Sequence, residues 1–121
     1  MMLALFDTCI LIDYLNGLPQ AKKELSLYEN KAISQITWME VMVGTTPDNK
    51  AQTRAYLEQF HVIDIDKPIS EMAVIIRKSE RVKLPDAIIW ASAKHNNLNL
   101  VTRNTKDFSS DHPGIRVPYQ V

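Results

Sequence analysis

The sequence predicts an α/β fold, in which helices cover a central, mainly parallel sheet of four to five strands. Short aliphatic runs alternate with longer helical patterns along the chain. The first run, at 1–6, is continuously apolar, as is typical of a strand covered on both faces. With 45% apolar and 23% charged residues among 121, the composition is that of a globular protein, and we expect one domain over 1–121.

The first half of the chain is expected to contain two strands and four helices. Strands are predicted at 1–6 and 31–36. Gly44 and Pro47 are stop signals between two of the helices. The four helices are predicted at 9–15, 18–30, 37–44 and 49–60.

The second half is expected to complete the alternation. A helix at 68–81 ends before Pro85, and Asp86 is expected to open an apolar helix that runs to about His95. Strands are predicted on either side of these helices and at the end of the chain, where a proline is tolerated at a sheet edge. The three strands are predicted at 61–65, 98–102 and 114–118.

Charge and residue counts exclude several classes of protein. The 14 basic residues balance 14 acidic ones, so any contact with nucleic acid must be local. The single Cys9 excludes an internal disulfide and is interpreted as a small buried hydrophobe. No apolar run is long enough to span a bilayer and no signal peptide is recognisable, so we expect a cytoplasmic protein without membrane contact. Surface or loop positions are expected for His61, His95 and His112, and core positions for Trp38 and Trp90.

Four carboxylates occupy positions where an α/β fold places ligands. Asp7, Glu40 and Asp107 each follow a predicted strand, while Asp86 begins a helix that must lie against the sheet. In parallel sheets, ligands bind beyond the carboxyl ends of the strands, where the strand order reverses. We therefore predict that these four side chains converge.

Each carboxylate also has a structural explanation, and these alternatives stay open. A helix cap or the helix dipole accounts for Asp7 or Asp86, a capping box with Thr37 for Glu40, and a turn for Asp107. By position alone, two aspartates after the third strand are equally eligible as site residues: Asp64 and Asp66.

Four converging carboxylates require a cation or protons. At separations of roughly 5–8 Å, each ionised pair repels by about 2–3 kcal/mol at an effective dielectric constant of about 20. The six pairs then sum to on the order of 10 kcal/mol, which is comparable to the whole stability of a domain. Oxygen-only ligands select Mg²⁺ or Mn²⁺, and a cation held in this way commonly serves phosphate chemistry.

Three stretches carry a more specific pattern: LFDTCILIDYL at 5–15, ITWMEVMVG at 36–44, and LPDAIIWASAKHNNLNLVTRNTKDF at 84–108. In this order they resemble the PIN-domain family, and within it the VapC-type toxins of toxin–antitoxin pairs. The resemblance implies a three-layer α/β/α fold and an endoribonuclease that depends on Mg²⁺ or Mn²⁺.

The resemblance also assigns roles to the acidic residues. Asp7, Glu40 and Asp86 match the first three acidic positions of the family. Asp7 and Asp86 are expected to hold the metal, while Glu40 and Asp107 would act through water or a second ion. Many relatives carry an aspartate where this chain has Asn104, so Asp107 is the expected substitute.

Several neighbours of the carboxylates are expected to support them. Thr8, Thr102 and Asn104 match polar positions that orient carboxylates, water or phosphate in the family. A basic run lies directly upstream of Asp86 and is either solvated helix surface or a contact to the phosphates of RNA. The candidate RNA contacts are Arg77, Lys78, Arg81, Lys83 and Arg103.

The resemblance implies partners as well, and two rival functions remain. Relatives pair with a small antitoxin, form homodimers and cleave RNA, and tRNA is one candidate substrate; an antitoxin helix would lie in an apolar groove. One rival is a PIN module that has kept the fold without catalysis. The other is a receiver-type signalling domain, in which Asp64 would accept a phosphoryl group and Lys106 would assist.

Overall fold

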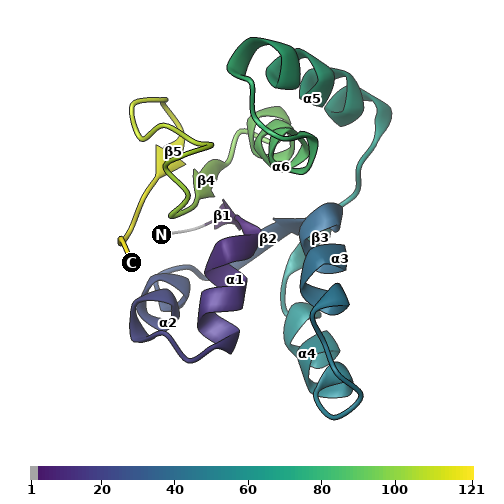
Figure 1. Cartoon of the computed structure of the whole chain (residues 1–121), viewed down its shortest axis with the longest axis vertical. Coiled ribbons are helices and arrows are strands. Elements are labelled where there is room, and N and C mark those ends of the chain that lie inside the picture. The colour runs from purple at the N-terminus through teal and green to yellow at the C-terminus, as the bar shows by residue number, and fades with distance from the viewer. Residues whose placement is uncertain (1–2) are drawn as a thin grey trace.

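A sheet of five strands in the order β3-β2-β1-β4-β5 lies at the centre of the computed structural model, and every neighbouring pair is parallel (Figure 1). The structure describes residues 3–121, so Met1 and Met2 of the predicted first strand lie outside it. The strands are β1 (Leu3–Phe6), β2 (Asn30–Ser34), β3 (His61–Ile63), β4 (Asn99–Val101) and β5 (Ile115–Arg116).

Helices cover both faces of this sheet. In Figure 1, α5 and α6 lie on one face and the other four helices lie on the opposite face. This arrangement confirms the predicted three-layer α/β/α fold. The helices are α1 (Thr8–Leu15), α2 (Pro19–Ser26), α3 (Gln35–Val43), α4 (Lys50–Leu57), α5 (Lys67–Glu80) and α6 (Leu84–His95).

The apolar character of β1 follows from its position in the middle of the sheet. Leu5 packs in the core formed with α5 and α6, which also contains Trp90. Phe6 points to the opposite face, where its ring contacts Tyr28 and Phe60 edge to face, at 5.1 and 6.4 Å between centroids. Because both faces are covered, the three residues of β1 that follow the exposed Leu3 are all buried.

Several predicted boundaries differ from the structure, and capping explains one of the differences. The helix predicted at 18–30 ends at Ser26, and β2 already begins at Asn30. The strand predicted at 31–36 ends at Ser34, because the Ser34 hydroxyl accepts a hydrogen bond from the N–H of Ile36 at 3.3 Å and caps α3. Thr37 therefore lies inside α3, and the capping box proposed for Glu40 is not formed.

The helix that carries Asp86 begins two residues earlier than predicted. It starts at Leu84, with Pro85 in its first turn, where a proline costs no intrahelical hydrogen bond. Asp86 is consequently an acidic residue of the first turn, close to the positive end of the helix dipole.

The tryptophans and histidines fit the sequence predictions only in part. Trp90 is buried as predicted, but Trp38 is half-buried and the guanidinium of Arg54 lies over its ring. His61 and His95 are exposed and His112 lies in a loop, as predicted; His112 is half-buried there, pairs with a glutamate and packs on Trp90. Within 3–121, no helix is both long and apolar enough to cross a membrane.

The strand order reverses between β1 and β4. From β1 the chain moves outward through β2 to β3, and then returns to place β4 on the other side of β1. Phe6 pairs with Val101 across this junction, so the next residues, Asp7 and Thr102, emerge side by side at the carboxyl ends. Such a reversal is where open α/β sheets bind ligands.

The same order argues against a receiver domain. In flavodoxin-like receivers the third strand lies beside the first. Here β3 is an edge strand, separated from β1 by β2. Asp64 follows β3 and is exposed. The residue predicted to accept a phosphoryl group therefore lies away from the point where the strand order reverses.

Candidate active site

Asp7 is a buried carboxylate at the centre of the site. Only 3% of its surface is exposed. Its Oδ1 accepts a hydrogen bond from the N–H of Thr8 at 2.8 Å, which caps α1. Its Oδ2 accepts from the Thr102 hydroxyl at 2.7 Å and from the Cys9 thiol at 3.3 Å. The cap interpretation is thus correct, but a cap alone does not account for three donors on a buried carboxylate.

Burial raises the pKa of Asp7 above its ordinary value, because the charged form loses hydration. The hydrogen bonds from Thr102, Cys9 and Thr8 oppose this rise, and the negative charge of Glu40 adds to it. The three donors therefore orient Asp7, but no positively charged side chain of residues 3–121 is among the groups that shift its pKa.

Cys9 was interpreted as a buried hydrophobe, and the structure assigns it a polar contact instead. It is half-buried, and its Sγ lies 3.7 Å from the Thr102 hydroxyl as well as next to Asp7. Burial and the charge of Asp7 raise the pKa of this thiol to about 12. Cys9 is therefore a protonated donor that helps to hold Asp7, a role that its position two residues after Asp7 could have suggested.

Glu40 reaches the site from α3. The Thr8 hydroxyl donates to its Oε1 at 2.6 Å and is also hydrogen-bonded to the Thr37 hydroxyl at 3.0 Å. Thr8 follows Asp7 directly, so this small network connects α1 to α3 beside the buried aspartate. Thr8 was predicted to support a carboxylate, and the carboxylate that it contacts is Glu40. Thr37 joins the same network, and this contact was not predicted from the sequence.

Asp86 and Asp107 complete the cluster from the other side. The pKa of Asp86 is raised to about 7, first by burial and then by the charge of Asp7, a hydrogen bond with Asp107 and the charges of Asp107 and Glu40. Asp86 therefore interacts with all three other carboxylates. The structure brings the four predicted residues together, and it leaves Asp64 and Asp66 outside, with Asp66 capping α5.

Asn104 orients Asp107. The Asn104 side-chain amide donates to Asp107 Oδ2 at 2.8 Å, and the Asn104 backbone N–H donates to the Thr102 hydroxyl at 3.0 Å. The turn interpretation of Asp107 is consistent with this geometry, because its own N–H approaches Asn104 Oδ1 at 3.4 Å. Asn104 thus holds Asp107 in place, and the assignment of Asp107 to the fourth acidic position remains a prediction.

Replacement of Asn104 by alanine should weaken the site without unfolding the chain. Losing an amide that orients a ligand typically costs tenfold to a hundredfold in activity or metal affinity. We expect Asn104→Ala to lower nuclease activity about tenfold, mainly as a higher Mg²⁺ requirement. A Mg²⁺ titration of activity, with exposed Gln20→Ala as the control, checks this result; an unchanged titration curve would contradict it.

An ion pair fixes the loop that carries these residues. Arg103 donates to both carboxylate oxygens of Asp13 on α1, at 2.5 and 2.9 Å, and the hydroxyl of Tyr119 donates to Asp13 at 2.8 Å. The guanidinium and its hydrogen bonds lower the pKa of Asp13. This network has no signal in the sequence, because Arg103 and Asp13 lie ninety positions apart. A contact of Arg103 to RNA stays a prediction, but its guanidinium is already paired.

The basic run upstream of α6 is exposed, as either of its two interpretations requires. Arg77 and Lys78 end α5, and Arg81 terminates that helix in the left-handed conformation, with φ of 58°. Lys83 caps α6, three residues before Asp86. Contact of this run with RNA phosphates remains a prediction.

The donor set fits a hard divalent cation in chemistry, although the side chains are not arranged as a finished metal site. Among residues 3–121, no group of three or more His, Cys, Asp or Glu side chains is already close enough to hold an ion. The mutual repulsion that raises the pKa of Asp86 is nevertheless what a cation would relieve. Metal binding by Asp7 and Asp86 therefore remains a prediction.

The raised pKa of Asp86 predicts an unusual dependence of stability on pH. An acid whose pKa is higher in the fold stabilises it fully below its ordinary value of 3.8, and this contribution is lost as the pH rises through about 7. The metal-free protein should therefore melt at a higher temperature at pH 5.5 than at pH 8. Asp13 and Glu24 have lowered pKa values and so lose their contributions only at more acidic pH.

Thermal unfolding in EDTA at these two pH values checks this prediction. Asp86→Asn should reduce the difference, and Mn²⁺ added at pH 8 should raise the melting temperature of the parent protein. A parent protein that is more stable at pH 8 than at pH 5.5 without metal would contradict it.

A comparison with known protein families identifies the family of this chain. The family model described as PIN domain matches residues 4–110. The chain belongs to the PIN-domain family. The match spans the four carboxylates and the polar residues around them, so the residues that converge in the structure lie within the shared domain.

Several solved structures have the same fold as this chain. A toxin-antitoxin complex from Klebsiella pneumoniae contains a chain that is 48% identical, with a TM-score of 0.92 and coverage of 98% of this chain and 99% of that one. A DNA-bound VapBC from Salmonella typhimurium matches with 26% identity, a TM-score of 0.77 and 96% coverage of each chain. FitAcB from Neisseria gonorrhoeae matches in fold, with 23% identity, a TM-score of 0.80 and full coverage of both chains. No curated protein sequence matched significantly.

Proposed function

We propose that this PIN domain is a VapC-type toxin that hydrolyses RNA phosphodiester bonds with Mg²⁺ or Mn²⁺. One observation carries the proposal: Asp7, Glu40, Asp86 and Asp107 converge where the strand order reverses. PIN-domain nucleases generally use divalent metal ions, and the similarity to a chain of a toxin-antitoxin complex supports the same class of activity here.

The residues of the site would have different roles, which follow from their positions. Asp7 and Asp86 would hold the ion, which supplies charge for the phosphate and lowers the pKa of a bound water. Thr102 and Cys9 keep Asp7 oriented through their hydrogen bonds to Oδ2. Glu40, fixed by Thr8, can position the attacking water.

The opposite side of the site has its own task. Asp107 is held by Asn104 at 2.8 Å, so it can accept a hydrogen bond from water or approach a second ion. Because the hydrogen bond between Asp86 and Asp107 requires a proton, we expect a bound cation to replace that proton at neutral pH. Substrate phosphates would then approach between the two pairs of carboxylates.

Partners and location follow from the same class of protein. A small antitoxin is proposed as the inhibitor, in line with the toxin-antitoxin complex that contains the similar chain. A homodimer and a cytoplasmic location belong to the same proposal. Exposed apolar side chains on α3, Met39 and Val43, offer surface for such contacts.

The test compares two nucleic acids of identical sequence. Purified protein, free of antitoxin, is incubated with end-labelled single-stranded RNA and DNA in Mn²⁺, and the products are resolved on a sequencing gel. The proposal predicts cleavage of RNA at one or a few positions. A folded protein that binds Mn²⁺ but cleaves neither strand would instead favour the inactive PIN module.

A further inference from the structure

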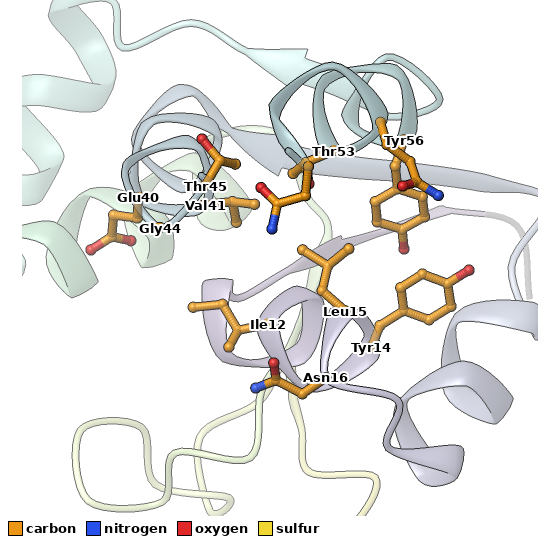
Figure 2. Close-up of a pocket in the computed structure, with 12 residues that line it drawn as sticks. Ile12, Tyr14, Leu15, Asn16, Glu40, Val41, Gly44, Thr45, Thr53 and Tyr56 are labelled. Carbon is orange, nitrogen blue, oxygen red and sulfur yellow. The ribbon is translucent and has the colours of Figure 1, made fainter. Parts of the chain in front are cut away.

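A pocket of about 470 Å³ opens between α1, α3 and α4, directly beside the candidate active site. Figure 2 shows Ile12 and Leu15 of α1 on one wall and Thr53 and Tyr56 of α4 on the other. Glu40 of α3 also lines this pocket. Since Glu40 is hydrogen-bonded to Thr8 in the carboxylate cluster, the pocket and the cluster share a side chain.

The charges of the pocket argue against phosphate as its ligand. None of the residues that line it is lysine, arginine or histidine, and its one charged side chain is Glu40. An anionic group would therefore meet a carboxylate and no cation. A phosphate is therefore disfavoured in this pocket, whereas an uncharged group can enter it without meeting a like charge.

The remaining side chains suit a flat, neutral ring with polar edges. Ile12 and Leu15 are each 41% exposed and can pack against the face of a ring. Asn16 and Gln52 also line the pocket, and both are exposed, so their side-chain amides are accessible to a ligand. Side-chain amides offer paired donors and acceptors that match the edges of bases.

We propose that this pocket binds an unpaired nucleobase of the substrate RNA, next to the phosphodiester that is cleaved; this inference rests on the proposed nuclease function. The phosphate lies at the carboxylates, and the base of the adjoining nucleotide enters between α1 and α4. Asn16 and Gln52 contact its edge, and Ile12 and Leu15 contact its face. Specific ribonucleases recognise unpaired bases in this way.

The experiment removes the base and the pocket separately. A single-stranded RNA that the protein cleaves at one position is prepared intact and with an abasic residue on either side of the cleaved bond. Each is cleaved by the parent protein, by Asn16→Ala/Gln52→Ala, and by a matched control, Gln20→Ala/Gln59→Ala, which removes two exposed amides outside the pocket.

The expected result is a loss that depends on both partners. An abasic residue at one flanking position should lower kcat/KM of the parent and control proteins about tenfold, the order of effect that a base contact provides. The pocket variant should cleave intact RNA about tenfold more slowly and lose little more on the abasic RNA, because the two changes remove the same contact.

Three results would overturn the inference in distinguishable ways. No cleavage of any RNA by the parent protein would remove the proposed function and this inference with it. If neither abasic residue changes kcat/KM, or if the losses from the abasic RNA and from the pocket variant multiply, the pocket does not bind a base, although the nuclease function stands. Unchanged cleavage by the pocket variant, with weaker binding of a purified antitoxin, would make the pocket a protein-docking surface.

Discussion

Asp7→Asn and Asp86→Asn are each expected to abolish measurable RNA cleavage while leaving the protein folded. Asp7 is buried and held by three donors, and Asp86 interacts with the other three carboxylates. Loss of a direct metal ligand should cost more than the tenfold to hundredfold typical of outer-shell partners, so we expect at least about a hundredfold decrease.

Stability should change in the opposite direction in Asp86→Asn. Removal of this charge relieves repulsion in the metal-free protein, so its melting temperature in EDTA at pH 8 should rise above that of the parent. Activity and unfolding are measured on the same preparations, with Asp64→Asn as a control at an exposed position. Full activity in both Asp7→Asn and Asp86→Asn would show that the metal assignment is wrong.

Arg103→Ala is expected to cause the largest loss of stability. It would leave Asp13, whose side chain is 11% exposed, without its cation, while Tyr119 alone still donates to it. Breaking a buried ion pair costs about 3–5 kcal/mol. We expect about 3 kcal/mol here, because the Arg103 side chain is 29% exposed. Chemical denaturation measures this difference directly.

The double variant Asp13→Leu/Arg103→Ala separates the unpaired charge from the lost packing. If the buried carboxylate causes the damage, removal of both partners should recover part of the stability, and the two changes should not be additive. If Arg103→Ala is as stable as the parent protein, this ion pair does not hold the loop that carries Asn104 and Asp107.

The sequence was sufficient for the layers of the fold and for the four carboxylates. Apolar runs covered on both faces are distinctive, and parallel strands bring their carboxyl ends to one edge of a sheet. Asp7 could therefore be placed from the length of one strand. Asp86 required the inference that an apolar helix lies against the sheet, and the structure confirms it through the core position of Trp90.

Contacts between distant side chains could not be predicted in the same way. Asp13 and Arg103 have no sequence signal of their own, because an arginine in a loop fits an RNA contact as well as an ion pair. The Ser34 cap was missed because Thr37 with Glu40 fits the spacing of a capping box. Such choices depend on where β2 ends in space, which a local pattern does not determine.

Cleavage of total cellular RNA tests the central claim most directly. Purified protein is assayed with Mg²⁺, with Mn²⁺ and with EDTA, and Asp86→Asn is run beside it under the same conditions. The account predicts a few discrete products with either ion, and none with EDTA or with the variant. Cleavage that persists in EDTA, or that Asp86→Asn retains in full, would contradict a metal-dependent ribonuclease centred on these four carboxylates.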